Sequence, residues 1–367
     1  MTIPFLELRD AYDELAGEID IAVKRVTSSG WYIGGSECER FEKAWAHYCD
    51  ADHCVGLGNG LEALALSLRV LGIGEGDEVI VPSNTYIASW LAVSMAGAIP
   101  VPVEPNPLTH VIEAEAIAPA ITPRTRGIMP VHLYGHPCPM DEIVDLARSH
   151  NLAIVEDAAQ AQGASIAGRK IGAHGDLVAW SFYPTKNLGA LGDAGAVTTN
   201  RADLAERIRL LSNYGSRAKN VHEVKGFNSR LDPIQAAILG VKLAHLDEWN
   251  DRRRRIASVY SEQLADCGLI LPHVPNWAEP VWHLYVVQAR DRDRLASRLA
   301  DAGVQTLVHY PTPPHLQDAY ADMAKSPGSF PIAEQLAKTV LSIPIGPQLS
   351  LDQAEQVADA IKNSVQQ

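Results

Sequence analysis

The stretch WSFYPTKNLGALGDAGA, residues 180–196, places one lysine between an apolar, β-prone run and a glycine-rich run of small residues. A lysine ammonium normally lies in water at the surface. Phe182 and Tyr183 precede Lys186 and Leu188 follows it, so the sequence predicts a strand end with this amine in an apolar pocket. Loss of hydration favours the neutral amine, a nucleophile toward carbonyl groups. The plain alternative is a lysine whose stem crosses apolar surface and whose head reaches water.

Short apolar runs alternate with helical patterns through the first two-thirds of the chain. The pattern predicts a helix over 141–150, and buried strands at DEVIVP (77–82), GIMPVHLYG (127–135), LAIVED (152–157) and DLVAWSFY (176–183). This alternation is typical of the α/β class, with a large, mostly parallel sheet covered on both faces. Ligands bind beyond the carboxyl ends of the strands in such sheets, so functional residues are expected there.

A second, smaller α/β unit is expected after about residue 250. Asp232 and Pro233 start a long helical pattern that runs through 233–255, because aspartate caps a helix and proline suits its first turn. Beyond it the sequence predicts a strand at 283–289, a helix at 293–303, a strand at 304–311 and a last helix begun by the capping box of Ser350 and Gln353. The prediction is a large domain over 1–245 and a small C-terminal domain over 246–367.

Composition excludes several classes of protein. The net charge of −13 without a basic tail argues against nucleic acid as a partner. Five scattered cysteines, an odd number, favour a reducing cytoplasm over a disulfide framework. The start, MTIPFLELRD, lacks a signal-peptide pattern. The uncharged run 79–103 is interrupted by prolines and polar residues, which favours strand, short helix and strand over a membrane span.

Two clusters have simple interpretations. His47, Cys49, His53 and Cys54 match no zinc spacing, so we expect a helix end and a buried strand there, and no metal. The run RRRR at 252–255 has acidic neighbours in a helical context, which indicates a solvated, ion-paired face.

Two further segments carry chemistry at expected strand ends. In GLGNGLEALALSLRVLG (56–72) the helical pattern starts near Gly60, where free N–H groups can hold a phosphate; the alternative is a plain tight turn. Asp157 ends a predicted strand and Gln160 follows three residues later. A carboxylate there can keep a ring nitrogen protonated while the amide reaches an oxygen of the same ring; the alternative is a helix cap.

The order of these features points to one cofactor. A phosphate site, then an acidic residue at a strand end, then a lysine after a later strand is the order expected of a pyridoxal phosphate enzyme. Lys186 would take the aldehyde, Asp157 the pyridinium nitrogen and the helix N-terminus at Gly60 the phosphate.

The motifs together resemble the DegT/DnrJ/EryC1/StrS family of sugar aminotransferases, a branch of the aspartate-aminotransferase fold (fold type I). The resemblance runs through nearly the whole chain, in PFLELRD, SSGWYIGG, GNGLEAL, GDEVIVPSNTYIAS, PVHLYG, VEDAAQAQGA, SFYPTKNLGALGDAGAV, NYGSRAKN, FNSRLDPIQAAIL, HLDEWNDRR and VHYPTPPHLQDAY. Within the family, KNLGALGDAGA and EVIVPSNTYIASWLAV are similar to dTDP-3-keto-6-deoxyhexose transaminases that make Fuc3N- or Qui3N-type precursors.

The resemblance implies roles for individual residues. Lys186 and Asp157 would be catalytic. The cofactor would be held by Gly60, Leu61, Tyr86, Asp157, Gln160, Ser181 and Lys186, with Asn228 reaching over from a second subunit. Residues Tyr183, Tyr214, Lys219, His309 and Tyr310 would line the nucleotide-sugar site between two subunits of a homodimer.

The implied reaction is transamination of a dTDP-linked 3-keto-6-deoxyhexose with L-glutamate as amino donor, supplying a deoxyamino sugar for a glycan such as the lipopolysaccharide O-antigen. The alternatives are the same chemistry on a 4-keto nucleotide sugar or a cyclitol ketone. A dehydratase of the same fold carries histidine in place of Lys186, and a silent regulator would not need it. The chain departs from the family pattern at Thr185, where close relatives have glycine, and at Val221 and His222. The configuration at C4 of the sugar stays open.

Overall fold

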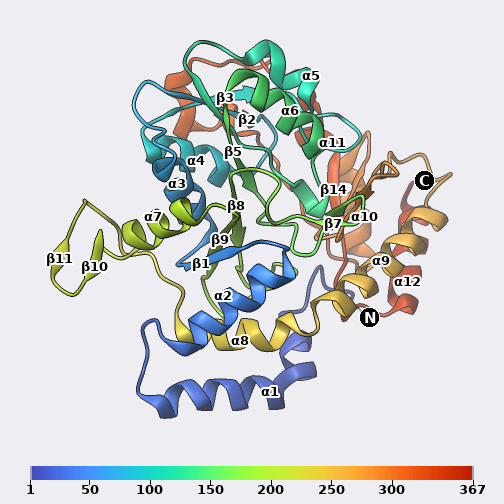
Figure 1. Cartoon of the computed structure of the whole chain (residues 1–367). Coiled ribbons are helices and arrows are strands. Elements are labelled where there is room, and N and C mark those ends of the chain that lie inside the picture. The colour runs from blue at the N-terminus through green and yellow to red at the C-terminus, as the bar shows by residue number, and fades with distance from the viewer. Residues whose placement is uncertain (1, 366–367) are drawn as a thin grey trace.

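A seven-stranded sheet forms the centre of the computed structural model, which describes residues 2–365 (Figure 1). In spatial order its strands are β1 (His53–Leu57), β9 (Gly195–Thr199), β8 (Leu177–Ser181), β5 (Ala153–Asp157), β4 (Thr125–Ile128), β2 (Glu78–Pro82) and β3 (Ile99–Val103). Only β9 runs antiparallel to its neighbours in this sheet. The expected mostly parallel sheet is confirmed, and Asp157 and Ser181 end adjacent strands at one edge.

Two hydrophobic clusters cover the two faces of this sheet. Ile80 and Trp180 point to the face covered by α2 (Ser36–Tyr48), α6 (Met140–His150) and α8 (Pro233–Leu243). Their chain neighbours Val79 and Ala179 point to the face covered by α3 (Gly60–Val70), α4 (Ile87–Ala96) and α7 (Ala202–Ser212). Because successive strand residues alternate between faces and both faces are buried, the strands are near-continuous apolar runs.

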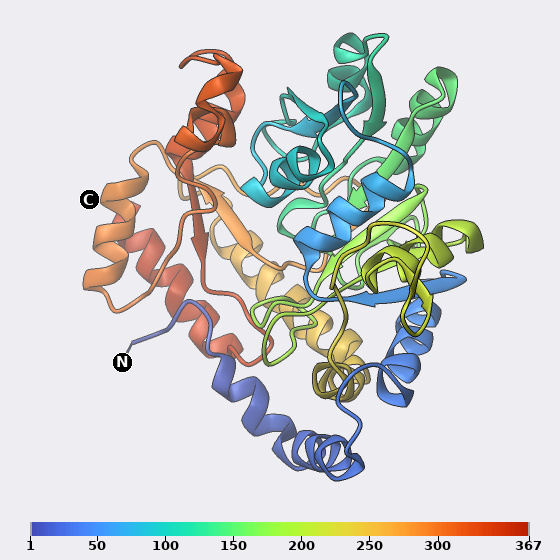
Figure 2. The same cartoon turned by 90° about the vertical axis from the view of Figure 1, so that its left-hand side faces the viewer.

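A third cluster lies in the C-terminal part. It joins α9 (Leu246–Gln263), α10 (Arg292–Asp301) and α12 (Leu351–Val365) to the antiparallel pair β13 (Tyr285–Gln288) and β14 (Val340–Ile343). Ile3 belongs to the same cluster and bridges to Val304. Figure 2 shows this start of the chain, in blue, beside the red C-terminal helices. The division at 245/246 stays a prediction.

The remaining elements are short or peripheral. They are α1 (Leu8–Ser29), α5 (Ala114–Ile117), α11 (Pro331–Thr339), the strands β6 (Ser165–Ile166), β7 (Arg169–Lys170), β10 (Ser216–Ala218), β11 (Val221–His222) and β12 (Ala278–Glu279), and the 3-10 turns η1 (Ala118–Ala120), η2 (Leu133–Gly135), η3 (Pro314–Leu316) and η4 (Asp318–Met323). The capping box is confirmed, since Ser350 Oγ accepts from the Gln353 N–H while Gln353 Oε1 accepts from the Ser350 N–H.

Four local predictions were wrong. The helix expected over 233–255 is two helices, with a break at Ala244–His245 that no glycine or proline announces. The strand expected at 127–135 ends at Ile128 and leads into η2, because the chain turns at Tyr134, whose φ is 61°.

The other two errors lie in the C-terminal part. The segment 304–311 makes only single bridges, to Ile3 and Ser342, rather than a strand. Within RRRR, Arg252 and Arg254 form the expected ion pairs, but Arg253 is buried and donates to the carbonyl oxygens of Trp282, His283 and Ile345.

Within residues 2–365, no helix combines the length and apolar character that a bilayer crossing requires. Over the same range, no group of three or more His, Cys, Asp or Glu side chains could hold a metal ion. His47 lies in the last turn of α2 and His53 begins β1, which matches the helix end and strand that the sequence indicated.

Trp180 is a core residue of β8, next to Ser181 at the carboxyl end of that strand. A substitution of Trp180 tests how much the core stabilises this part of the sheet. Its side chain is fully buried, its Nε1–H donates to Thr198 Oγ1 at 2.9 Å, and its ring packs edge-on against Trp45 at 5.0 Å. We expect Trp180→Ala to lower the free energy of unfolding by about 3–5 kcal/mol through lost burial and a cavity. Urea unfolding measures this, with the half-exposed Ile270→Ala as a control; equal losses in both variants would contradict it.

Candidate active site

Lys186 lies in a tight loop that follows β8. Its backbone N–H donates to the Tyr183 carbonyl oxygen at 2.8 Å, and the Ala190 N–H donates to the Phe182 carbonyl oxygen at 2.8 Å. Gly189 packs so closely on Pro184 that a Cβ would lie 2.3 Å from its carbonyl oxygen. Glycine is therefore needed at 189 for backbone contact, and the loop presents Lys186 at the carboxyl end of the sheet.

The electrostatics of Lys186 match the expectation from the sequence. Phe182 and Leu188 beside it are fully buried, while Lys186 itself is half-buried. Loss of hydration lowers the pKa of Lys186 to about 8, and the attraction of the Asp157 carboxylate acts in the opposite direction. A substantial fraction of the amine is thus neutral near physiological pH.

Asp157 is the last residue of β5 and is buried. Its Oδ1 accepts from the Ala159 N–H at 3.2 Å, and its Oδ2 accepts from Ser89 Oγ at 2.8 Å. Burial raises the pKa of Asp157, whereas the two hydrogen bonds and Lys186 act to lower it. The carboxyl group therefore lies where a cation can pair with it.

Gln160 and two tyrosines form one wall next to Asp157. Gln160 Oε1 accepts from the Tyr134 N–H at 2.6 Å, and Nε2 donates to the Tyr310 hydroxyl at 3.1 Å. Because a backbone N–H can only donate, the amide orientation is fixed and Nε2 keeps a second hydrogen. The Tyr86 ring lies 5.2 Å from the Tyr310 ring and is half-exposed, so its face is accessible.

Two backbone N–H groups are free where α3 begins. Asn59 caps this helix, because its Oδ1 accepts from the Glu62 N–H. Among the described residues, the N–H groups of Gly60 and Leu61 donate to no protein acceptor. A Cβ at Gly60 would lie 2.8 Å from Ser181 Cβ, so this close approach puts Ser181 beside the two N–H groups. Two free donors at a helix N-terminus and a neighbouring hydroxyl suit a phosphate.

The predicted sugar-site residues divide into two groups. Tyr183, His309 and Tyr310 lie near Lys186: Tyr183 is exposed, and Lys186 contributes with desolvation to lowering the pKa of His309 to about 4. Tyr214, Lys219 and Asn228, by contrast, lie on an excursion that carries the β10–β11 hairpin, which stands out from the body in Figure 1.

The ring contact and the backbone hydrogen bond of Tyr214 lie within this excursion. Tyr214 packs under the Arg230 guanidinium at 5.6 Å, Lys219 lies at the hairpin tip, and Asn228 is exposed. Sequence reasoning missed Ser89 and Tyr134, which contact Asp157 and Gln160, and Thr85, which contacts Ser89. The hydroxyl groups of Thr85 and Ser89 inside the uncharged run 79–103 were the available signal.

Comparison with known proteins identifies the kind of enzyme. Residues 13–362 match the model of the DegT/DnrJ/EryC1/StrS aminotransferase family. The chain belongs to this family. It is a pyridoxal phosphate-dependent aminotransferase of fold type I.

Three relatives show how far the similarity extends. The chain is 55% identical to dTDP-3-amino-3,4,6-trideoxy-alpha-D-glucose transaminase of Streptomyces venezuelae, covering 98% of this chain and 95% of that protein. It is 50% identical to dTDP-3-amino-3,6-dideoxy-alpha-D-galactopyranose transaminase of Aneurinibacillus thermoaerophilus, covering 98% of each. The solved structure of S. venezuelae DesV in complex with a ketimine intermediate superposes with a TM-score of 0.98 at 54% identity, covering 100% of this chain and 99% of that one.

The pKa of Lys186 predicts how the aminotransferase takes up its cofactor. Only the neutral amine attacks an aldehyde, so the rate at which the cofactor-free chain gains the visible absorbance of bound pyridoxal phosphate should rise with pH around a midpoint of about 8. Stopped-flow absorbance measures it. In Asp157→Asn the midpoint should fall, because the carboxylate that favours the ammonium is lost. A midpoint at the ordinary lysine value would contradict this.

Proposed function

We propose that this aminotransferase moves an amino group from L-glutamate to a dTDP-linked 3-keto-6-deoxyhexose, giving a dTDP-3-amino-3,6-dideoxyhexose. The observation that carries the proposal is the site itself: an amine with a pKa of about 8 beside a buried carboxyl at adjacent strand ends. Two relatives at 50% identity or more, named for 3-amino dTDP-sugars, support the substrate class.

The residues present fit pyridoxal phosphate. Lys186 would bind its aldehyde carbon, and Asp157 would pair with its ring nitrogen. Gln160 would donate the second Nε2 hydrogen to the ring oxygen, and Tyr86 would stack on the ring face. The phosphate would accept from the Gly60 and Leu61 N–H groups and from Ser181, and Asn228 of a partner chain would complete that site. The two free N–H groups beside Ser181 are the clearest support.

The bound cofactor supplies an electron sink for the carbon that loses a proton. This chain's residues supply the proton transfers and the orientation. Lys186 Nζ takes the proton from the α-carbon of the amino donor, and later returns one to C3 of the sugar as that carbon gains its amine. A pKa near the working pH suits both directions. Asp157 keeps the ring nitrogen protonated, which maintains the sink.

The sugar would lie on the Lys186 side of the ring. Tyr183, His309 and Tyr310 would contact the hexose. Tyr214 and Lys219 would reach the nucleotide across the subunit boundary, where the Lys219 ammonium suits a diphosphate.

The competing proposal is the same chemistry on a 4-keto nucleotide sugar or a cyclitol ketone, because Lys186 and Asp157 would serve any of these ketones. The names of the two relatives place the amine at C3 in both cases, which favours the 3-keto sugar. They differ at C4, which is deoxygenated in the 3,4,6-trideoxy sugar of one relative and carries a galacto-configured hydroxyl in the sugar of the other, so they do not fix C4 of the product.

Purified enzyme with L-glutamate distinguishes these substrates. We expect turnover of a dTDP-3-keto-6-deoxyhexose with a kcat/KM at least about a hundredfold above that for a UDP-4-keto sugar, measured as 2-oxoglutarate release. The Lys186→Ala protein is the control and should lose both the visible absorbance of the bound cofactor and turnover. Faster amination of the UDP-4-keto sugar would reverse the choice, and a fully active Lys186→Ala protein would refute the mechanism.

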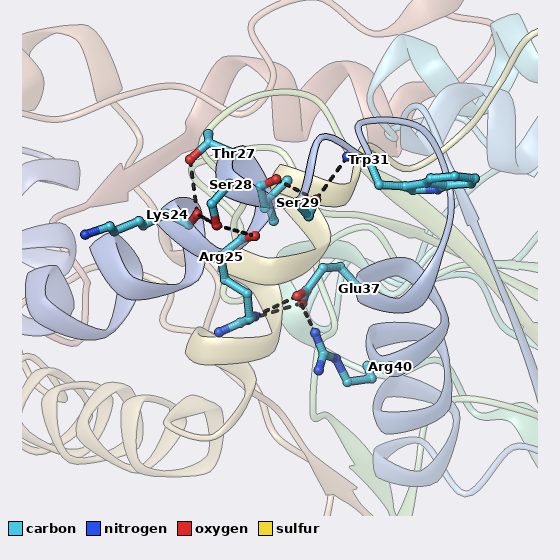
Figure 3. A network of polar contacts seen from close by, with 9 residues as sticks. Lys24, Arg25, Thr27, Ser28, Ser29, Trp31, Glu37 and Arg40 are labelled. Atoms are coloured by element: carbon cyan, nitrogen blue, oxygen red, sulfur yellow. Dashed lines mark hydrogen bonds and ion pairs between the residues drawn. The ribbon is translucent and has the colours of Figure 1, made fainter.

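We also propose a homodimer with shared sites. The loop after α1 exposes Trp31, Tyr32 and Ile33, with exposed fractions of 65%, 58% and 53%. Figure 3 shows that this loop is held in place: the Trp31 N–H donates to Ser29 Oγ at 3.0 Å, and Glu37 pairs with two arginines below it. An exposed apolar loop is typical of an interface, and in this proposal Asn228 of the second copy completes the phosphate site.

Light scattering on the purified protein tests the dimer. We expect twice the mass of one chain for the wild type and a shift toward single chains in Trp31→Asp, because a charge would be buried without a partner. Ile270→Asp is the control, since Ile270 is half-exposed on the C-terminal part. A fully active single chain would overturn the shared site.

A further inference from the structure

A chain of two hydroxyl groups leads to the carboxylate of Asp157. Thr85 precedes α4, and Ser89 lies in its first turn; both side chains are buried, with exposed fractions of 2% and 1%. Thr85 Oγ1 lies 2.9 Å from Ser89 Oγ, and Ser89 Oγ lies 2.8 Å from Asp157 Oδ2. The contact joins a helix on one face of the sheet to the end of β5.

The direction of these hydrogen bonds follows from the charge on Asp157. An ionised carboxylate can only accept, so the single hydroxyl hydrogen of Ser89 goes to Asp157 Oδ2. Ser89 Oγ then has lone pairs left and accepts from Thr85 Oγ1. A protonated Asp157 could donate to Ser89 and reverse the order. The chain written from Thr85 to Ser89 to Asp157 is therefore the arrangement that matches the ionised acid.

The other carboxylate oxygen is held as well. The Ala159 N–H donates to Oδ1 at 3.2 Å, so each oxygen of Asp157 has one fixed donor and keeps one lone-pair direction for a further partner. Burial opposes ionisation of Asp157, and Ser89 gives the largest opposing contribution. Hydrogen bonds to a charged acceptor are the strong ones.

We propose that Ser89, supported by Thr85, is a positioning residue that keeps Asp157 ionised and aimed at the ring nitrogen of the cofactor. This inference rests on the proposed function, in which Asp157 pairs with that nitrogen. A purely structural serine would act on the fold alone, so its loss would weaken the binding of any ring of the same shape equally.

Two probes separate these roles. Pyridoxamine 5′-phosphate carries the ring nitrogen and forms no covalent bond to Lys186, and its 1-deaza analogue has carbon in that position. Calorimetric titration of the full-length, cofactor-free chain gives the Kd of each probe. For Ser89→Ala we expect a Kd about tenfold weaker for pyridoxamine phosphate, in line with one hydrogen bond to a charged group, and a Kd within about twofold of wild type for the analogue.

Matched variants control for folding. Ser94 lies on the same helix, and its hydroxyl bonds to the Tyr320 hydroxyl at 3.1 Å, away from Asp157. Ser94→Ala should leave both Kd values unchanged. Ser89→Thr should restore the wild-type difference between the probes, because it keeps the hydroxyl. Thr85→Val should reproduce the Ser89→Ala pattern in weaker form, since Ser89 then lacks its own donor.

The results separate the two hypotheses. Equal weakening of both probes in Ser89→Ala, or no change in either, overturns the positioning role. A wild-type chain that binds the two probes equally removes the pairing of Asp157 with the ring nitrogen as well. A wild-type chain that binds neither overturns the proposed function itself.

Discussion

The structure depends on one electrostatic compromise at the carboxyl ends of β5 and β8. Removing Lys186 and Asp157 from water favours the neutral form of each, so burial lowers the pKa of the amine and raises that of the acid. Their attraction opposes both shifts. Desolvation and the attraction of Asp157 partly cancel, so the pKa of the Lys186 amine is about 8. Parallel neighbouring strands make this possible, because their carboxyl ends meet at one edge.

The glycine-rich run after Lys186 owes its composition to backbone contacts. Gly189 allows the loop to close on Pro184, and Lys242 Nζ holds the Gly189 carbonyl at 2.7 Å. At Gly195 a Cβ would come within 2.4 Å of the Asn59 carbonyl carbon. The same run therefore ties the lysine loop to the residue that caps α3. A substitution in this run would displace the amine and the start of α3 together.

The sequence predicted the parts of the site that local patterns encode. Strand ends, the start of α3 at Gly60 and the order of Asp157 and Lys186 follow from periodicity and capping, which act within a few residues. Tyr134 could not be predicted, because its positive φ is stabilised by tertiary contacts such as that from Gln160. The break between α8 and α9 has no local signal either. The roles proposed for Tyr214, Lys219 and Asn228 involve a second chain, which the structure of one chain does not contain.

His283 and His309, the two histidines near Lys186, are uncharged and therefore add no positive charge beside its amine. Desolvation lowers the pKa of His309 to about 4 and holds that of His283 well below its ordinary value, and Lys186 adds to both shifts. His309 Nδ1 lies 2.8 Å from Ser342 Oγ and His283 Nδ1 lies 3.2 Å from Asn187 Oδ1, so both rings are oriented without an ion pair. A positive charge on either ring would disfavour the protonated form of Lys186 and lower its pKa below the range in which it exchanges protons well. Because both imidazoles are neutral, the Asp157 carboxylate is the charged partner that opposes the desolvation of Lys186.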